Sequence, residues 1–428
     1  MANIGIFCLP MPSHLNLFLA LGGALARRGN RLIFFSVLDN ERKIREAGFD
    51  FYSTDPDAAP RDTFTQIKQR IGKRGTFAAM RAQGRFDELR YDAILRKGPD
   101  LALRAALDGV IVDQAEACSG SVAEVLGLPW VSVASALAMN IEPQVPLLFT
   151  TWDYSQNPFA VLRNRLAYST LELAAVRTRH IINRYRKRWG LRPLRCTNDA
   201  FSPFAQLSQQ NAEFDFPRKE LPACFHYVGP IRCASRPAVP FPWQRLDSRP
   251  LIYASLGTVN QHRRVFEAIA QSCAELDAQL VLSLGGAGNV ADFRDLPGAP
   301  LVVEFAPQLD LLERAALTIT HAGLNTTLES LAAGVPLVAV PLNFDQFGVA
   351  ARIRWTGTGD FIRLRKLTPD RLRALIQEVL TNPRYTEAAR RMHDAIAATK
   401  GSERAADIIE EVIRTRKPVL NSPAVQAT

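Results

Sequence analysis

The sequence is poor in cysteine and contains no long apolar run. Its six cysteines, spread over 428 residues, form none of the close Cys-x-x-Cys pairs of a zinc ribbon or a thioredoxin-like site. We therefore expect the thiols to be packing groups in a reducing compartment. No apolar stretch reaches the roughly 18 residues that a membrane-spanning helix needs, so any membrane association is expected to be peripheral.

We also expect no secretory signal. The apolar stretch at residues 15–26 resembles the core of a signal peptide, but no basic segment precedes it. With 47% hydrophobic and 22% charged residues, the composition excludes an intrinsically disordered protein, because the chain can bury a large core. The length predicts two or three domains of ordinary size.

Positive charge is concentrated in one half of the chain. Residues 1–240 carry 31 Lys and Arg against 22 Asp and Glu, a net charge of +9, whereas residues 241–428 carry 21 against 20, a net charge of +1. A broad basic excess beside apolar residues suits an anionic membrane surface, whereas a phosphate-rich ligand would need only a local pocket. A solvated basic face without a partner is the alternative, and we expect no nucleic acid partner.

Short apolar strands alternate with segments of helical periodicity. A strand at residues 3–9, a helix at 15–28 and a strand at 32–37 form one βαβ unit, and the pattern recurs at 109–112, 115–126 and 130–133. After six prolines between Pro217 and Pro242, the alternation restarts, with strands expected at 251–255, 280–284, 301–305, 317–320 and 335–340. The pattern predicts an α/β protein with two doubly wound parallel sheets.

The proline-rich stretch marks the expected domain boundary. Two such domains bind ligands between them, at the carboxyl ends of the strands. The predicted division is an N-terminal acceptor-binding domain at 1–230, a linker at 231–249, a C-terminal nucleotide-sugar-binding domain at 250–400, a final helix at 401–417 and a loose tail at 418–428.

Residues suited to ligand binding are most concentrated between residues 305 and 346. A strand ends at His321, a glycine-containing turn follows, and a helix begins near Asn325. Backbone N–H groups at a helix start attract anions, and His321 and Asn325 add side-chain donors. Glu329, one turn further, has a carboxylate suited to the vicinal hydroxyls of a ribose. For His321, a histidine that only satisfies strand-end carbonyls is the alternative.

This segment resembles the nucleotide-sugar box of the UDP-dependent glycosyltransferases of family 1, which have the two-domain GT-B fold. The closest resemblance is to bacterial zeaxanthin glucosyltransferases and macrolide-type glycosyltransferases, which Phe214-Asp-Phe-Pro217 and His226-Tyr-Val-Gly-Pro230 also suggest. It spans nearly the whole chain. It implies two Rossmann-like domains that face a cleft, with the C-terminal helix crossing back to the N-terminal domain.

The resemblance also implies the donor-binding residues. Those that would hold the diphosphate are Ser255, Gly257, Thr258, His321, Gly323, Asn325 and Thr326. Gln308 and Glu329 would take the ribose, and Asp345 and Gln346 the sugar hydroxyls. Phe305 stands where many members have a tryptophan stacked on uracil, and a smaller aromatic face makes base selectivity less certain.

Two of these interpretations have structural alternatives. Phe305 could instead be a core aromatic at a strand end. The glycine-rich segment at residues 285–288 could approach a phosphate, but a plain surface turn is the favoured interpretation.

His14 and Asp113 are the candidate catalytic residues. His14 follows the first strand, and Asp113 ends the strand at residues 109–112, so both belong at the carboxyl edge of the first sheet. Histidine can act as a general base near neutral pH, and a carboxylate can orient it and stabilise its imidazolium. In the family that the chain resembles, these two positions form the catalytic pair. A structural histidine in a turn is the alternative for His14.

The acceptor side combines aromatic and basic residues. Aromatic and aliphatic side chains between Trp152 and Leu171 alternate with arginines, and residues 163–188 hold eight basic residues against the single Glu172. An interfacial helix has this composition. An ordinary amphipathic helix packed on its own domain is equally compatible with it.

These observations lead to one hypothesis. The protein is expected to be an inverting, metal-independent glycosyltransferase that moves a hexose, first of all glucose, from a UDP-sugar to a hydroxyl of an apolar acceptor. A hydroxylated carotenoid such as zeaxanthin is the first acceptor; a membrane lipid, a polyketide, another small aglycone, or nonenzymatic binding of a sugar nucleotide or lipid are the alternatives. The only Asp-x-Asp, Asp55-Pro-Asp57, is far in sequence from the donor box, so we expect no metal site.

We expect no cofactor, because the UDP-sugar is a substrate. The protein is expected to be a monomer in the cytoplasm, with a peripheral contact at the inner face of the plasma membrane.

Overall fold

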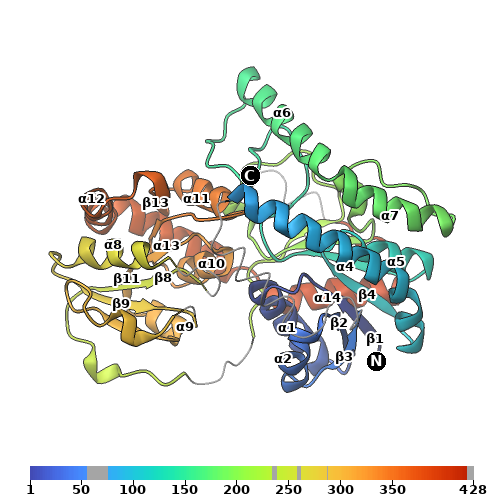
Figure 1. Cartoon of the computed structure of the whole chain (residues 1–428), viewed down its shortest axis with the longest axis horizontal. Helices are drawn as coiled ribbons and strands as arrows, with labels where there is room; N and C mark the ends of the chain where they lie inside the picture. Colours follow the sequence, from blue (N-terminus) through green and yellow to red (C-terminus); the bar gives the residue numbers. More distant parts are fainter. Residues whose placement is uncertain (55–75, 234–238, 258–261, 287, 422–428) are drawn as a thin grey trace.

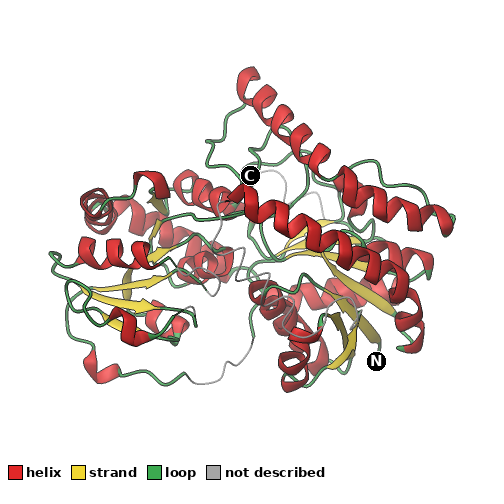
Figure 2. Ribbon diagram, in the orientation of Figure 1, coloured by secondary structure: helices red, strands yellow, loops and turns green. Residues whose placement is uncertain are grey.

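The computed structural model describes residues 1–54, 76–233, 239–257, 262–286 and 288–421. Its strands form two parallel sheets, which lie side by side in Figure 1. Helices cover both faces of the sheets (Figure 2). The sequence prediction of two doubly wound α/β domains is therefore confirmed.

The first sheet has seven strands in the order β3-β2-β1-β4-β5-β6-β7. Their bounds are β1 Asn3–Phe7, β2 Arg31–Ser36, β3 Asp50–Ser53, β4 Gly109–Asp113, β5 Trp130–Ala134, β6 Ala205–Ser208 and β7 Phe225–Tyr227. The helices of this half are α1 Pro12–Arg27, α2 Glu41–Glu46, α4 Thr76–Arg104, α5 Ser119–Val125, α6 Pro158–Ala174 and α7 Val176–Arg188. Every residue of β4 and β5 is buried, as expected of strands covered on both faces.

The second sheet has six strands in the order β10-β9-β8-β11-β12-β13. Their bounds are β8 Leu251–Ser255, β9 Gln279–Ser283, β10 Leu301–Val303, β11 Ala315–Thr320, β12 Leu337–Ala339 and β13 Gly359–Phe361. The helices are α8 Arg263–Cys273, α9 Gln308–Leu312, α10 Leu324–Ala332, α11 Gln346–Trp355, α12 Pro369–Thr381 and α13 Pro383–Ala397. In both sheets the switch in strand order falls beside the first strand, β1 or β8, where ligands bind in such folds.

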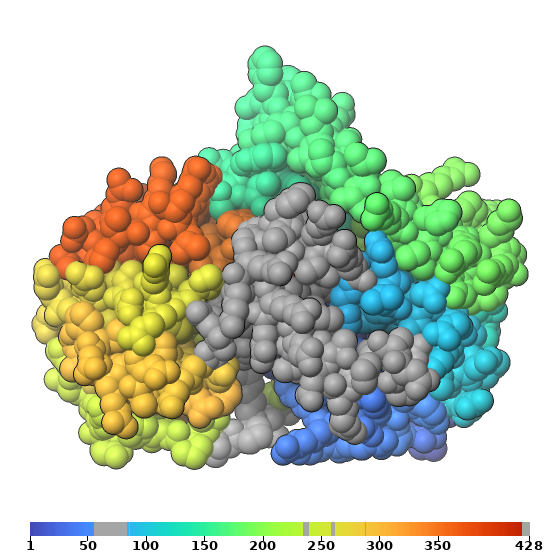
Figure 3. All heavy atoms as spheres, in the orientation of Figure 1, coloured from blue at the N-terminus to red at the C-terminus, as the bar shows by residue number. Residues whose placement is uncertain are grey.

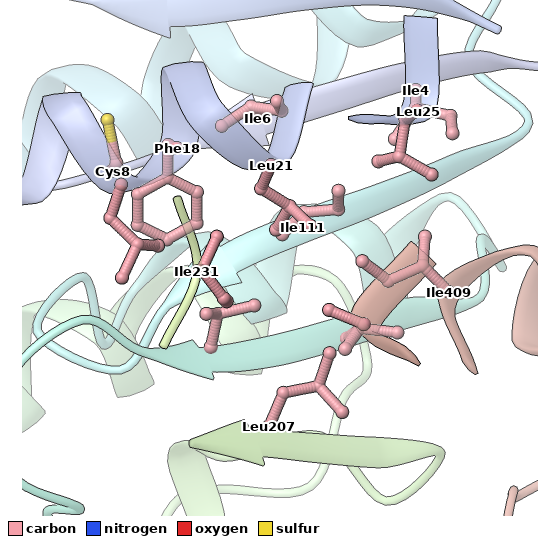
Figure 4. Close-up of a cluster of buried hydrophobic side chains, with 14 of the residues drawn as sticks. Ile4, Ile6, Cys8, Phe18, Leu21, Leu25, Ile111, Leu207, Ile231 and Ile409 are labelled. Atoms are coloured by element: carbon pink, nitrogen blue, oxygen red, sulfur yellow. The ribbon is translucent and has the colours of Figure 1, made fainter. Parts of the chain in front are cut away.

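The final helix, α14 (Gly401–Thr415), returns to the first domain. Ile408, Ile409 and Val412 are buried in the same core as Leu21 and Leu25 of α1, and Figure 4 shows Ile409 among these side chains. On the surface, Arg28 is paired with Glu403, Asp407 and Glu410 at 2.6–3.0 Å. The expected crossing helix is thus confirmed.

The residues after α14 are bound to the first domain as far as the structure describes them. The backbone N–H groups of Val419 and Asn421 donate to carbonyls of Phe204 and Ala223. His226 contacts the Val419 carbonyl at 3.0 Å. The predicted loose tail therefore does not include residues 418–421. The exact domain boundaries stay a prediction.

Candidate active site

The edges of two adjacent strands bring His14 and Asp113 together. Strands β1 and β4 pair in parallel, with Phe7 opposite Val112, so the residues that follow them emerge at one edge of the sheet. His14 lies in the first turn of α1, which begins at Pro12 and not, as the sequence pattern predicts, near residue 15. Its Nδ1 lies 2.6 Å from Asp113 Oδ2, and the exposed side-chain fractions of the two residues are 14% and 1%.

Ser135 completes this cluster, and sequence reasoning missed it. It follows β5, the strand beside β4, and its hydroxyl donates to Asp113 Oδ1 at 3.0 Å. The Ser135 hydroxyl oxygen also lies 2.6 Å from His14 Nδ1 and can accept a hydrogen bond from it. Its position just after a predicted strand could have identified it as a residue of this edge of the sheet. Leu9 and Ala115 backbone N–H groups also donate to Asp113, which fixes the carboxylate in place.

The surroundings of His14 favour its protonated form. Burial lowers the pKa of His14, but the charge and hydrogen bond of Asp113, together with the charge of Asp345, outweigh burial and raise the pKa above 6.5. Arg90 acts in the opposite direction. Because Nδ1 faces Asp113, Nε2 is the nitrogen that can receive a proton from a substrate.

Contacts between the two halves place the predicted donor box opposite His14. The Asn325 side chain accepts a hydrogen bond from Gln209 Nε2 at 2.8 Å, and the same Gln209 nitrogen donates to the Ser135 carbonyl. Asn325 Nδ2 lies 3.4 Å from the Ser13 carbonyl, next to His14. The predicted diphosphate residue Asn325 therefore faces the predicted base.

Asp345 and Gln346 stand at the start of α11. Burial raises the pKa of Asp345, while the nearby His14 and a hydrogen bond from the Leu137 backbone lower it in part. Gln346 uses its side-chain oxygen to accept the backbone N–H groups of Leu342 and Asn343, both at 2.9 Å. Only the amide nitrogen of Gln346 is then left for a ligand.

His321 is held between two glycines. A Cβ at Gly257 would lie 2.7 Å from the imidazole ring, and a Cβ at Gly323 would lie 2.6 Å from it. Gly257 also has a φ of +73°, which favours glycine. Burial lowers the pKa of His321 to about 4, so the ring is neutral at pH 7 and has one N–H to donate. Ser255 lies beside it, opposite Thr320 in the β8–β11 pairing.

The N-terminus of α10 follows this histidine. Gly323 is the N-cap residue, and the backbone N–H groups of Leu324, Asn325 and Thr326 form the first turn. Such unpaired N–H groups, with the helix dipole behind them, attract an anion. Thr258, also predicted to contact the diphosphate, lies outside the described residues.

Gln308 and Glu329, the two predicted ribose residues, are in direct contact. Gln308 begins α9 and its Nε2 donates to Glu329 Oε2 of α10. The Tyr253 hydroxyl of β8 donates to Gln308 Oε1 at 2.9 Å. Tyr253 has no signal in the sequence beyond its strand, so its role in orienting Gln308 could not be predicted.

Phe305 is a surface aromatic. Its side chain is 51% exposed, so the alternative of a core aromatic is wrong. A Cβ at Gly286, which has a φ of +75°, would lie 2.7 Å from the ring. The glycine turn at residues 285–286 is therefore a surface turn that also supports Phe305, and one ring face can stack on a planar base.

Among the described residues, no group of three or more His, Cys, Asp and Glu side chains is arranged to hold a metal ion. Asp55 and Asp57 lie outside the described ranges. In the part of the chain that the structure covers, no helix is both long enough and apolar enough to cross a membrane.

Comparisons with known proteins agree on one group. The family model described as UDP-glucoronosyl and UDP-glucosyl transferase matches residues 99–415. The zeaxanthin glucosyltransferase of Pantoea ananas is 36% identical, covering 98% of both chains. That of Pseudescherichia vulneris is 34% identical, covering 96% of this chain and 98% of the relative.

Solved structures support the same fold. CalG4, the calicheamicin glycosyltransferase, matches with a TM-score of 0.75 at 21% identity, over 98% of this chain and all of the other. The glycotransferase of kitacinnamycin matches with a TM-score of 0.74 at 22% identity, over 96% and 98% of the two chains. These likenesses confirm the GT-B fold.

Proposed function

Because the chain belongs to the UDP-glucoronosyl and UDP-glucosyl transferase family and is a glycosyltransferase, we propose that it transfers glucose from UDP-glucose to a lipophilic acceptor. The acceptor is glycosylated at a hydroxyl, with inversion at the anomeric carbon. The observation that carries the proposal is the largely buried His14–Asp113 pair, which faces Asn325 of the predicted donor box. A base and an anion-binding helix start on opposite sides of one site suit the displacement of a diphosphate.

His14 acts as the general base in this proposal. Its Nε2 takes the proton of the acceptor hydroxyl, and the acceptor oxygen forms a bond to the anomeric carbon. The bond from that carbon to the diphosphate oxygen breaks, and the electron pair leaves with UDP. Asp113 stabilises the imidazolium that forms, and Ser135 keeps the carboxylate oriented.

The second half of the chain supports the leaving group. Backbone N–H groups at the start of α10 and the neutral His321 donate hydrogen bonds to the diphosphate, in place of a metal ion. Gln308 and Glu329 hold the ribose, and Phe305 stacks on the base. Asp345 and Gln346 bind sugar hydroxyls, which would hold the anomeric carbon within reach of the oxygen activated by His14.

The proposed acceptor is a hydroxylated carotenoid. It is supported by two relatives that match this chain from end to end and are named zeaxanthin glucosyltransferase. A carotenoid dissolves in a bilayer and a UDP-sugar in water. We therefore infer an enzyme that works at the cytoplasmic side of a membrane, in peripheral contact with anionic lipid, which fits the +9 charge of residues 1–240. We further propose that it acts as a monomer.

The test combines purified protein with a panel of UDP-sugars and with zeaxanthin, β-carotene, a hydroxylated lipid or a polyketide, and detects products by mass. Zeaxanthin should gain a hexose from UDP-glucose, whereas β-carotene, which has no hydroxyl, should stay unchanged. UDP-glucose binding without a glycoside of any hydroxylated carotenoid, lipid or polyketide would replace the proposal with a nonenzymatic binding protein.

A further inference from the structure

Helix α6 carries an exposed apolar stripe. Large apolar side chains with exposed fractions between 46 and 85% line α6 and the first residue of α7: Phe159, Leu162, Leu166, Leu173 and Val176. Steps of three, four, seven and three residues put them on one face of the helix. In Figures 1 and 3 this helix projects from the body of the molecule.

The opposite face of α6 attaches the helix to its own domain. Ala160, Asn164 and Tyr168 recur every four residues and are buried. Asn164 Nδ2 donates to the Pro143 carbonyl at 3.0 Å. The N-cap Asn157 accepts the Ala160 N–H, so the helix start is well formed. The apolar stripe therefore points outward because the buried face is already used.

The charges beside the stripe are positive. Arg165 and Arg177 are exposed, and neither is ion-paired with a carboxylate of the described residues. Glu172, the one acidic residue of α6, is already paired with Arg179. Arg163 lies over the Trp152 ring at 4.2 Å. A partner for this surface must be apolar and negatively charged at once.

We propose that α6 is the membrane-docking element of this protein, lying in the plane of the interface with its stripe among the acyl chains and its arginines at anionic headgroups. A second copy of the chain fits less well, because two such stripes packed together would bring Arg165 and Arg177 of both copies close, while Glu172 of α6 is already paired with Arg179. The inference rests on the proposed function, since a lipophilic acceptor explains why the enzyme needs a membrane.

The same structure limits which arginines take part. The sequence predicts an interfacial stretch that reaches residue 188, but three arginines of α7 form ion pairs within the chain, Arg179 with Glu172 and two others with α4 and α5. Arg184 is paired with Asp92 at 2.6 Å, and the buried Arg186 is paired with Glu124 at 2.8 Å. These pairs fix α7 to α4 and α5. Docking is therefore assigned to α6 and its flanking arginines.

Docking through α6 would hold the catalytic edge near the bilayer. Ser135, which contacts His14, directly follows β5, and residues 136–157 connect it to the start of α6. Within that segment, Gln144 accepts a hydrogen bond from Gln156, and Asn140 is bonded to Gln206 of β6. Residues 136–157, held by these hydrogen bonds, therefore connect the proposed docking helix α6 to the His14 site.

The experiment is sedimentation with vesicles of phosphatidylcholine alone or mixed with phosphatidylglycerol, at low salt. The native protein should sediment with the mixed vesicles, and Phe159→Ser/Leu162→Ser/Leu166→Ser should bind them at least about tenfold more weakly. The matched control, Leu89→Ser/Leu103→Ser/Leu364→Ser, removes three other exposed leucines and should bind as the native protein does. Arg165→Gln/Arg177→Gln should weaken binding to the mixed vesicles only.

Two further measurements separate this inference from the proposed function. UDP affinity and transfer to a detergent-dispersed acceptor should be equal in the native protein and the stripe variant. Vesicle binding without any sugar transfer would keep the docking inference and overturn the function. A native protein that ignores mixed vesicles, a stripe variant that still sediments, or a stripe-dependent dimer without vesicle binding would overturn the docking inference.

Discussion

Arg352 of α11 is ion-paired with Asp215 of the other half of the molecule, at 2.6 Å between Nη2 and Oδ1, and both side chains are almost fully buried. Asp215 also accepts hydrogen bonds from Arg218 Nε at 2.9 Å and from the Tyr227 hydroxyl at 2.8 Å. Arg352 further lies over the Phe216 ring at 4.3 Å. The Phe214-Asp-Phe-Pro segment thus connects the two halves through one carboxylate.

Asp215→Asn should destabilise the protein strongly. Two guanidinium groups would lose their buried counter-charge, and breaking such a pair costs about 3–5 kcal/mol. A thermal or urea melt measures the effect. Asp247→Asn is the control, since the Asp247–Arg249 pair is exposed, and it should melt as the native protein does. Equal melting of the Asp215 variant and the native protein would contradict a structural role for this pair.

The stabilisation by Asp215 has a defined pH range. Burial raises the pKa of Asp215, but the nearby Arg218 and Arg352 outweigh it and hold the pKa well below its usual value. A carboxyl group whose folded-state pKa is lowered stabilises the fold above its unfolded pKa, about 3.9, and loses that contribution as the pH falls through the folded value. The difference in stability between native protein and Asp215→Asn should therefore shrink only in strong acid.

His14→Ala should lower turnover by roughly 10²-fold or more, with UDP affinity almost unchanged, because the base acts on the acceptor. Asp113→Asn should have a similar effect. Because the two residues act as a unit, the double variant should lose much less turnover than the two single losses combined. Steady-state kinetics and calorimetry measure both quantities. His180→Ala, at an exposed histidine of α7, is the control. Native turnover in His14→Ala would remove His14 from the reaction.

The acid limb of the pH–rate profile should follow the pKa of His14. Burial lowers its pKa, Asp113 and Asp345 together raise it beyond 6.5, and Arg90 opposes them. The base must be unprotonated, so kcat/KM should fall as the pH drops through this raised pKa. Asp345→Asn removes one negative charge and should move the acid limb to lower pH.

The position of that limb is the measured quantity, because Asp345→Asn is also expected to weaken sugar binding and so to lower the rate. Asp310→Asn, at an exposed carboxylate of α9, should leave the limb where it is. An unshifted limb in Asp345→Asn would show that Asp345 does not act on His14.

The sequence predicted the sheets because parallel strands are buried on both faces and appear as short apolar runs. It also predicted His14 and Asp113, since residues that follow adjacent strands emerge at one edge. Strands β3, β6, β7 and β13 were not predicted, because each mixes polar with apolar residues, as in Phe225-His-Tyr227, whereas the similarly short β10 and β12 are continuous apolar runs. The start of α1 was placed too late, since Pro12 supports the first turn of the helix and does not belong to the preceding turn.

Contacts made by distant residues could not be predicted. Asp215 and Arg352 are separated by 137 positions, and nothing local marks either as the other's partner. Ser135 and Tyr253 likewise became visible only when the strands were in register. The charge excess of the N-terminal half was real, but the sequence could not tell the ion-paired Arg184 and Arg186 from the exposed Arg165 and Arg177.

His321→Ala and Glu329→Ala should each weaken UDP binding by about 1.5–3 kcal/mol, the usual value for a hydrogen bond to a charged group. Calorimetry with UDP measures this directly. Glu313→Ala is the control, because Glu313 is an exposed carboxylate of the same domain. Native UDP affinity in both variants would remove the second domain from donor recognition.

Gly323→Ala should weaken UDP binding although it removes no hydrogen-bonding group. Gly323 has φ −66° and ψ 131°, which alanine adopts without strain, so the added methyl group acts only through contact. That methyl would lie 2.6 Å from the His321 ring and must displace it. In Gly323→Ala/His321→Ala the ring is absent, so the double variant should bind UDP about as well as His321→Ala alone. If the two losses add in full, the alanine acts on the helix start itself and not through His321.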